Sequence, residues 1–212
     1  MTVRGLDGGE PAALVINECQ NGMVNPDFAS RPGLADEADR RGMVGHLAAL
    51  ARACREAGVL VVHSTIVPRP DHLGTLRNCL LLASLVKNGV VVAGNPAAEI
   101  HPDLTPQDGD VVLARVHGLT PFHSTELEPI LRSRGVQTVI VTGVSTNVGI
   151  PGACLEAVNR GFTVVVPEDC TAGAWPEAHE FQVQHTLPLL ATVTTSADVA
   201  AVLAGRGVPA TG

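Results

Sequence analysis

The chain has 212 residues, a formal net charge of −7, 45% hydrophobic residues and 17% charged residues. This composition predicts a globular protein with a substantial core and excludes a disordered chain. The negative charge argues against nucleic acid or an anionic membrane surface as the main partner. Because no apolar run reaches about 18 residues and no signal or lipidation motif is present, we expect a cytoplasmic protein.

Apolar runs alternate with helical patterns along the chain. The polar, glycine-rich residues 1–10 predict a flexible arm, followed by one domain over residues 11–212. We expect strands at 12–19, 59–63, 110–114, 136–142, 162–166 and 192–194. We expect helices at 35–57, 73–87, 124–134, from 147 onward, at 176–187 and at 196–204. This order predicts a three-layer α/β/α fold around an open parallel sheet of roughly six strands.

The stretch 136–161 reads as a buried strand that turns directly into a helix near Asn147. Free backbone N–H groups at a helix N-terminus favour anions or developing oxyanions. In a parallel sheet this turn also lies at the carboxyl ends of the strands, where such folds bind ligands. A nucleophile would be well placed here, but the position holds Gly149.

Polar residues close to strand ends are the other candidates for a site. They are Glu18, Gln20, His63, Arg115, Asn147 and Asp169, together with Gly149. A carboxylate at Glu18 is either paired or has a raised pKa, and both are common in active sites, whereas the alternative is a carboxylate that tethers a loop. Arg115 could pair with Glu18, in a functional or a purely structural ion pair. His63 is either a base or ligand, or a histidine bonded to a loop carbonyl.

Five cysteines are scattered without a CxxC motif, so we expect small buried side chains and no disulfide framework. Cys154 lies one helical turn beyond Gly149 and should not reach the same pocket. Cys19 adjoins Glu18, but strand alternation directs it to the opposite face.

Three motifs in order resemble those of the isochorismatase-like hydrolases, or cysteine hydrolases, which include nicotinamidases and N-carbamoylsarcosine amidases. The resemblance covers residues 11–204. The motifs are VINECQNG at 15–22, GDVVLARVHGLTPFHSTELEPIL at 109–131 and GVSTNVGI at 143–150. They are similar to the family's Asp-x-Gln-Asn strand end, its lysine-containing strand with the following turn, and its Gly-Val-x-Thr-x-x-Cys nucleophile turn.

The resemblance implies an Asp-Lys-Cys triad, and this chain departs from it at every position. Glu18 stands at the Asp position, Arg115 at the Lys position and Gly149 at the Cys position. The resemblance also implies a cis peptide bond between Val144 and Ser145, and no cofactor. We expect the substrate to contact Gln20, His63, Phe122, Val144, Ser145 and Asn147.

A metal site is not expected. Nicotinamidases hold an ion through an Asp-x-His-x-x-x-x-His-type loop, whereas His63, Asp71 and His72 lack that spacing. His117 and His123 flank the turn at Phe122, and the sequence leaves their role open.

Gly149 excludes the covalent amidase mechanism at this position, because glycine carries no nucleophile. Isochorismatases of the same family also carry glycine there and cleave a vinyl ether without a covalent intermediate. The first hypothesis is therefore non-covalent acid/base hydrolysis of a small carboxylated metabolite, with Glu18 as acid or base and Arg115 binding the carboxylate. The alternative is an inactive small-molecule-binding or scaffold subunit. The resemblance also implies a homodimer or homotetramer, with the apolar helix at 73–87 suited to the interface.

Overall fold

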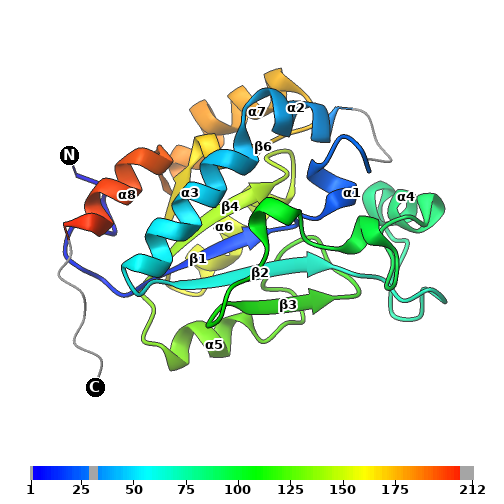
Figure 1. Ribbon diagram of the computed structural model, residues 1–212, viewed down its shortest axis with the longest axis horizontal. Coiled ribbons are helices and arrows are strands. Elements are labelled where there is room, and N and C mark those ends of the chain that lie inside the picture. The colour runs from blue at the N-terminus through cyan, green and yellow to red at the C-terminus, as the bar shows by residue number, and fades with distance from the viewer. Residues whose placement is uncertain (1, 29–32, 206–212) are drawn as a thin grey trace.

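The computed structural model describes residues 2–28 and 33–205, which contain a seven-stranded parallel sheet (Figure 1). The strand order is β3-β2-β1-β4-β5-β7, and β6 pairs with β4. The strands are β1 (Ala12–Asn17), β2 (Leu60–Ile66), β3 (Val111–Arg115), β4 (Thr138–Val144), β5 (Thr163–Pro167), β6 (Thr171–Ala172) and β7 (Thr192–Thr194). The predicted α/β/α class is confirmed, and β6 is a short strand that the sequence did not predict.

The helices lie on both faces of this sheet. They are α1 (Asn21–Val24), α2 (Leu34–Arg40), α3 (Met43–Glu56), α4 (Leu80–Asn88), α5 (Leu127–Ser133), α6 (Gly149–Asn159), α7 (Pro176–Phe181) and α8 (Ser196–Ala204). Figure 1 shows α3 and α8 in front of the sheet and α6 behind it, while α4 lies at the end of the molecule opposite the N-terminus.

The core consists of two apolar clusters, one on each side of the sheet. Alternate residues of each strand serve the two clusters: Leu14 and Ile16 of β1 pack toward α3, whereas Ala13 and Val15 pack toward α5 and α6. Strand side chains point to opposite faces in turn, so a run that is apolar at every position fits a sheet covered on both sides.

Two predicted helices differ from the structure. The helix expected at 35–57 is interrupted between α2 and α3, because Gly42 adopts a left-handed φ of 61° that ends the helical path. The helix expected at 73–87 begins only at Leu80. Residues before it form turns, in which the Asp71 carboxylate accepts from the Leu73 N–H and Gly74 has φ 91°.

The N-terminal segment also differs from the flexible arm expected from its composition. Val3 and Leu6 are buried, and the Thr138 hydroxyl donates to the Gly5 carbonyl. Two apolar side chains therefore attach this segment to the α3 side of the core. The last seven residues of the predicted domain, 206–212, lie outside the described residues.

Within the described ranges, none of the helices has both the length and the apolar character needed to cross a bilayer.

Candidate active site

The centre of the site is the close approach of β1 and β4 at their carboxyl ends. Asn17 pairs with Gly143 in the parallel register. Gly143 has φ 93°, and a Cβ at this position would stand 2.1 Å from the Asn17 carbonyl oxygen, so only glycine fits. This contact brings the residue after β1, Glu18, beside the turn that leads from β4 into α6.

Glu18 has an unusual backbone conformation. Its φ is 53°, in the left-handed region, although it is not glycine. Its N–H donates to the Ser64 carbonyl at 2.8 Å, which continues the sheet pairing past the end of β1. A left-handed non-glycine residue costs about 1–3 kcal/mol, and such residues gather at active sites. The strain at Glu18 therefore favours a functional side chain here.

The Glu18 carboxylate accepts a hydrogen bond from Arg115 Nη2, as the strand-end positions predicted. The Arg115 side chain is only 2% exposed, and its Nη1 also donates to the Ser64 hydroxyl at 3.0 Å. Burial raises the pKa of Glu18, and the charge and hydrogen bond of Arg115 oppose that rise without cancelling it. Arg115 is thus a buried partner that holds Glu18.

The turn between β4 and α6 begins with a cis peptide bond between Val144 and Ser145, as predicted. The Ser145 carbonyl accepts from the N–H groups of Val148 and Ile150, and the Thr146 N–H donates to Ala172 of β6. These bonds close a compact turn whose far end is the N-terminus of α6 at Gly149. Because Val148 and Ile150 already donate to Ser145 and Pro151 has no N–H, Gly149 supplies the backbone donor that is left to face negative charge here.

Gly149 leaves little room for a side chain. A Cβ built on it would lie 3.1 Å from both the Asn17 amide nitrogen and the Val144 carbonyl oxygen. The Asn17 amide donates to that same carbonyl, so it fills the space next to Gly149. Residue 149 contributes backbone alone to the site.

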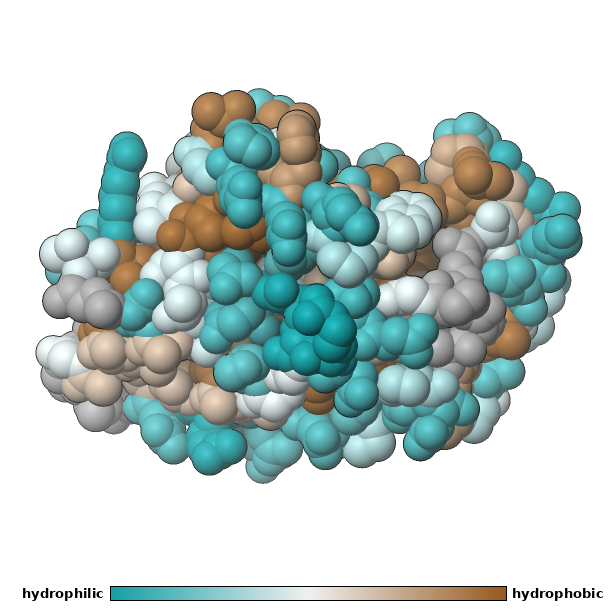
Figure 2. Space-filling model, turned by 90° about the horizontal axis from the view of Figure 1, so that it is seen from above, coloured by the Kyte–Doolittle hydropathy of each residue, from teal (hydrophilic) through white to brown (hydrophobic). Residues whose placement is uncertain are grey.

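A cavity of about 120 Å³ opens above these residues. Its volume is comparable to that of an engineered cavity of roughly 150 Å³ in another protein, which binds benzene. Glu18, Ser145 and Gly149 line it together with Asn88, and its other walls are mainly aliphatic: Met23, Leu34, Ile66, Leu81, Leu82, Leu85, Val90, Val91, Leu119 and Val148. Figure 2 shows apolar surface gathered at the α4 end of the molecule and a hollow beside it. The site is therefore a small apolar pocket with a carboxyl group in its wall.

The comparisons with known proteins agree with this geometry. The family model of the Isochorismatase domain matches residues 12–198. This chain belongs to the isochorismatase family. One relative, the maleamate amidohydrolase of Pseudomonas putida, is 32% identical over 173 residues, covering 82% of this chain and 77% of its own. The uncharacterized isochorismatase family protein YecD of Escherichia coli O157:H7 is 32% identical over 88% of this chain and 93% of its own.

Solved structures show the same fold. The isochorismatase family protein from Desulfovibrio vulgaris superposes with a TM-score of 0.79 at 27% identity, covering 92% of this chain and 99% of that one. The cysteine hydrolase from Pseudomonas syringae pv. phaseolicola gives a TM-score of 0.81 at 24% identity, covering 96% and 95%. The match to the Isochorismatase domain and the amidohydrolase relative, rather than the fold alone, support hydrolase activity.

The structure brings four of the predicted site residues to the pocket. Glu18, Ser145 and Gly149 line the cavity, whereas Arg115 does not line it but donates a hydrogen bond to Glu18. Val144 is buried next to the cavity, where its peptide bond to Ser145 is cis.

Other predicted residues have structural partners instead. The Gln20 amide is fully buried and donates to the Ile66 and Ala98 carbonyls, so it fixes a loop. Asn147 Oδ1 accepts from the Ala174 N–H at 2.8 Å. Neither side chain lines the cavity.

Three more candidates lie away from the pocket. β2 extends to Ile66, so His63 is in mid-strand, with Nε2 3.3 Å from Asp110 at the start of β3. Phe122 packs in the cluster on the α5 and α6 side. Asp169 accepts from the N–H and hydroxyl of Ser196 at the start of α8. Neither His63 nor Phe122 lines the cavity.

Sequence reasoning missed Asn17 and the pocket wall formed by α4. Asn17 is a polar residue at the end of the otherwise apolar strand β1, and this position could have indicated a site residue. The leucines of α4 could not be assigned to a pocket, because a helix that is apolar on most sides gives no unique buried face.

The cysteines do not supply a replacement nucleophile at the pocket. Cys19 and Cys154 are buried in opposite core clusters, and burial raises the pKa of the Cys154 thiol to about 12. His117 and His123 stack edge to face, with ring centroids 5.5 Å apart. Over residues 2–28 and 33–205, no group of three His, Cys, Asp or Glu side chains is arranged to hold a metal ion.

Proposed function

We propose that this protein hydrolyses a small molecule by non-covalent acid/base catalysis, with Glu18 as the proton-transferring group. The observation that carries the proposal is a strained, partly buried glutamate with a raised pKa in the wall of an apolar pocket. A carboxyl group whose pKa moves toward neutrality both gives and takes protons effectively. Gly149 offers no side chain for a covalent intermediate.

In this reaction water is the second substrate. For an amide, Glu18 takes a proton from water as its oxygen attacks the carbonyl carbon, and then delivers that proton to the departing nitrogen. For a vinyl ether, Glu18 protonates the terminal carbon, and water adds to the resulting oxocarbenium ion and returns a proton to Glu18. The hemiketal formed in this way then breaks its C–O bond to give a carbonyl compound and an alcohol. The Gly149 N–H at the start of α6 would stabilise negative charge that develops on an oxygen beside it, since the Val148 and Ile150 N–H groups already donate to Ser145.

The pocket supports a substrate with one polar, hydrolysable end and a small apolar body. The polar end would lie between Glu18 and Ser145, and the body against the leucines of α4. A substrate carboxylate, if present, would not reach Arg115, which is buried behind Glu18. Its place would be the start of α6, beside the Gly149 N–H.

A binding protein without activity is the second candidate, and one observation favours it. The Glu18 carboxylate is already committed to Arg115, and an ion pair of this kind can serve structure alone.

Turnover assays with intact-protein mass spectrometry separate these functions. The substrates are small amides, including maleamate because of the amidohydrolase relative, and small vinyl ethers. Turnover without a covalent adduct supports the proposal, whereas an adduct on any of the five cysteines contradicts it. No turnover, with a ligand that still raises the melting temperature, supports the binding protein.

A further inference from the structure

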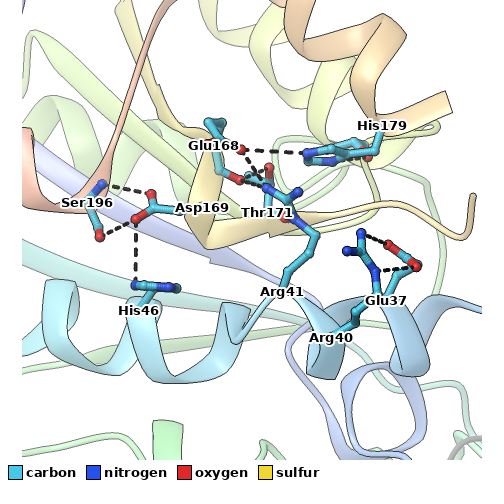
Figure 3. Close-up of polar contacts among 10 residues, drawn as sticks. Glu37, Arg40, Arg41, His46, Glu168, Asp169, Thr171, His179 and Ser196 are labelled. Atoms are coloured by element: carbon cyan, nitrogen blue, oxygen red, sulfur yellow. Dashed lines mark hydrogen bonds and ion pairs between the residues drawn. The ribbon is translucent and has the colours of Figure 1, made fainter. Parts of the chain in front are cut away.

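A chain of polar contacts connects the 145–149 turn through α7 to the segment between β5 and β6. The Thr146 hydroxyl is 3.1 Å from His179 Nδ1 of α7, and both residues are buried. His179 Nε2 lies 3.7 Å from Glu168 Oε2, in the segment between β5 and β6. Figure 3 shows His179 directed at Glu168.

Arg41, in the short break between α2 and α3, fixes the far end of this chain. Its Nη2 donates to the Glu168 carboxylate at 2.5 Å and to the Glu168 carbonyl at 3.1 Å, and its Nε donates to the Thr171 carbonyl at 3.2 Å. The neighbouring His179 ring and the guanidinium of Arg41 lower the pKa of Glu168, so this carboxyl is ionised at neutral pH. The arginine thus fixes both the side chain and the backbone of Glu168.

The two ring nitrogens of His179 face different partners. Nδ1 is within hydrogen-bond distance of the Thr146 hydroxyl, whereas Nε2 is 3.7 Å from the Glu168 carboxylate, an electrostatic contact rather than a hydrogen bond. Thr146 is then held through its hydroxyl and also through its N–H, which donates to Ala172. Gly173 packs tightly against the same turn, since a Cβ there would be 2.4 Å from the Thr146 hydroxyl oxygen.

We propose that Thr146, His179 and Glu168 are positioning residues that set the place of Ser145 and Gly149 relative to Glu18. The inference rests on the proposed function of this pocket. Thr146 follows directly after Ser145, which lines the cavity, so a shift of Thr146 moves a cavity wall. A misplacement of about 1 Å costs on the order of a hundredfold in rate when reacting groups must be aligned.

A second cluster in Figure 3 offers a matched control. Asp169, next to Glu168, accepts from the Ser196 N–H and hydroxyl and lies 3.7 Å from His46 Nδ1. It caps the start of α8, and among the described residues it makes no hydrogen bond or ion pair with the 145–149 turn. Glu168→Gln and Asp169→Asn therefore make the same chemical change in adjacent residues, but only the first lies in the chain to Thr146.

The first test compares steady-state kinetics of Thr146→Val, Thr146→Ser, Glu168→Gln and Asp169→Asn. Thr146→Val removes the hydroxyl at nearly constant side-chain volume, whereas Thr146→Ser keeps the hydroxyl. We expect kcat to fall on the order of tenfold or more in Thr146→Val and Glu168→Gln, with KM within about twofold. We expect Thr146→Ser and Asp169→Asn to keep the wild-type kcat within about twofold. An equal loss in Asp169→Asn, or no loss in Thr146→Val, overturns the proposal.

A second test does not depend on turnover, so it can be carried out even if the protein hydrolyses none of the substrates. Gly149→Cys places a thiol in the turn, and its alkylation rate by iodoacetamide, read by peptide mass spectrometry, reports the local geometry. Adding Thr146→Val or Glu168→Gln should change that rate several-fold, whereas adding Asp169→Asn should not. Equal rates in all three double variants overturn the positioning role, even if wild-type hydrolysis is found.

Discussion

At the scale of single residues, Glu18 combines features that rarely occur together without a function. Its backbone is left-handed, its carboxyl is mostly buried, and its partner Arg115 is more buried still. A glycine at position 18 would remove the backbone strain, and an apolar side chain there would remove the cost of burying a charge. The chain retains both costs at the edge of a cavity, which is the expected pattern at an active site.

Gly149 is the second informative residue, and its packing gives a stability prediction. Gly149→Ala would place a Cβ 3.1 Å from two polar atoms, whereas Gly45→Ala in α3 would meet nothing within 4 Å. Replacing a helical glycine by alanine in free space stabilises by about 0.5–1 kcal/mol. We therefore expect Gly45→Ala to raise the free energy of unfolding in urea titrations and Gly149→Ala to leave it unchanged or lower it. An equal gain in both variants would show that the space beside Gly149 is open.

At the scale of elements, the wall formed by α4 should select the apolar part of the substrate. Leu85→Ala removes part of that wall, while Leu189→Ala makes the same change on an 83% exposed residue outside the cavity. Burial of a leucine-sized surface contributes about 1.5–3 kcal/mol, so KM for a substrate with an apolar ring should rise on the order of tenfold in Leu85→Ala. Leu189→Ala should leave KM unchanged. Similar KM values for both variants would exclude α4 from the substrate site.

A polar cluster just before β3, at the end of that strand away from Arg115, is expected to affect stability rather than chemistry. Asp110 accepts from Arg55 at 2.7 Å and 3.1 Å and lies 3.3 Å from His63. Burial lowers the pKa of His63, and the hydrogen bond and charge of Asp110 oppose this only in part. Burial alone would raise the pKa of Asp110, but the hydrogen bonds from Arg55 and the Gln107 N–H outweigh it.

A pH dependence of stability follows from the direction of the His63 shift. Below the ordinary histidine pKa of about 6.5, the unfolded chain binds a proton that native His63 resists, so the free energy of unfolding falls as pH drops from there. The lowered pKa of Asp110 adds a further loss below about pH 4. Between about pH 4 and pH 6.5, the free energy of unfolding from urea titrations should change less with pH in His63→Gln than in the wild type. His185→Gln, on an exposed ring, should keep the wild-type slope, and an unchanged slope in His63→Gln would contradict this account.

At the scale of the whole molecule, the segment around the start of α4 exposes four leucines. They are Leu73, Leu76, Leu80 and Leu81, with Leu80 83% exposed. A patch of this kind on one segment favours self-association. We expect a homodimer or homotetramer in sedimentation equilibrium and dissociation to monomers in Leu76→Glu. A monomeric wild-type protein would contradict the expectation.

Much of this architecture could be predicted from the sequence, because alternation of strand and helix patterns determines an open parallel sheet. The contact between Glu18 and Arg115 was also predictable, since carboxyl ends of parallel strands meet at one edge. His63 was misplaced because β2 runs to Ile66, three residues beyond the predicted end. The burial of Arg115 and the α4 wall depend on packing between segments distant in sequence, which strand and helix periodicity does not encode.

The central claim is that Glu18 transfers the proton in a hydrolysis without a covalent intermediate. The most direct measurement is kcat for Glu18→Gln against wild type, with ligand binding followed in both by thermal shift. Glutamine keeps the shape of the side chain and the cost of the left-handed backbone but cannot exchange the proton. We predict a fall in kcat of about 10²- to 10⁴-fold with binding retained. A kcat within a few-fold of wild type would contradict the account.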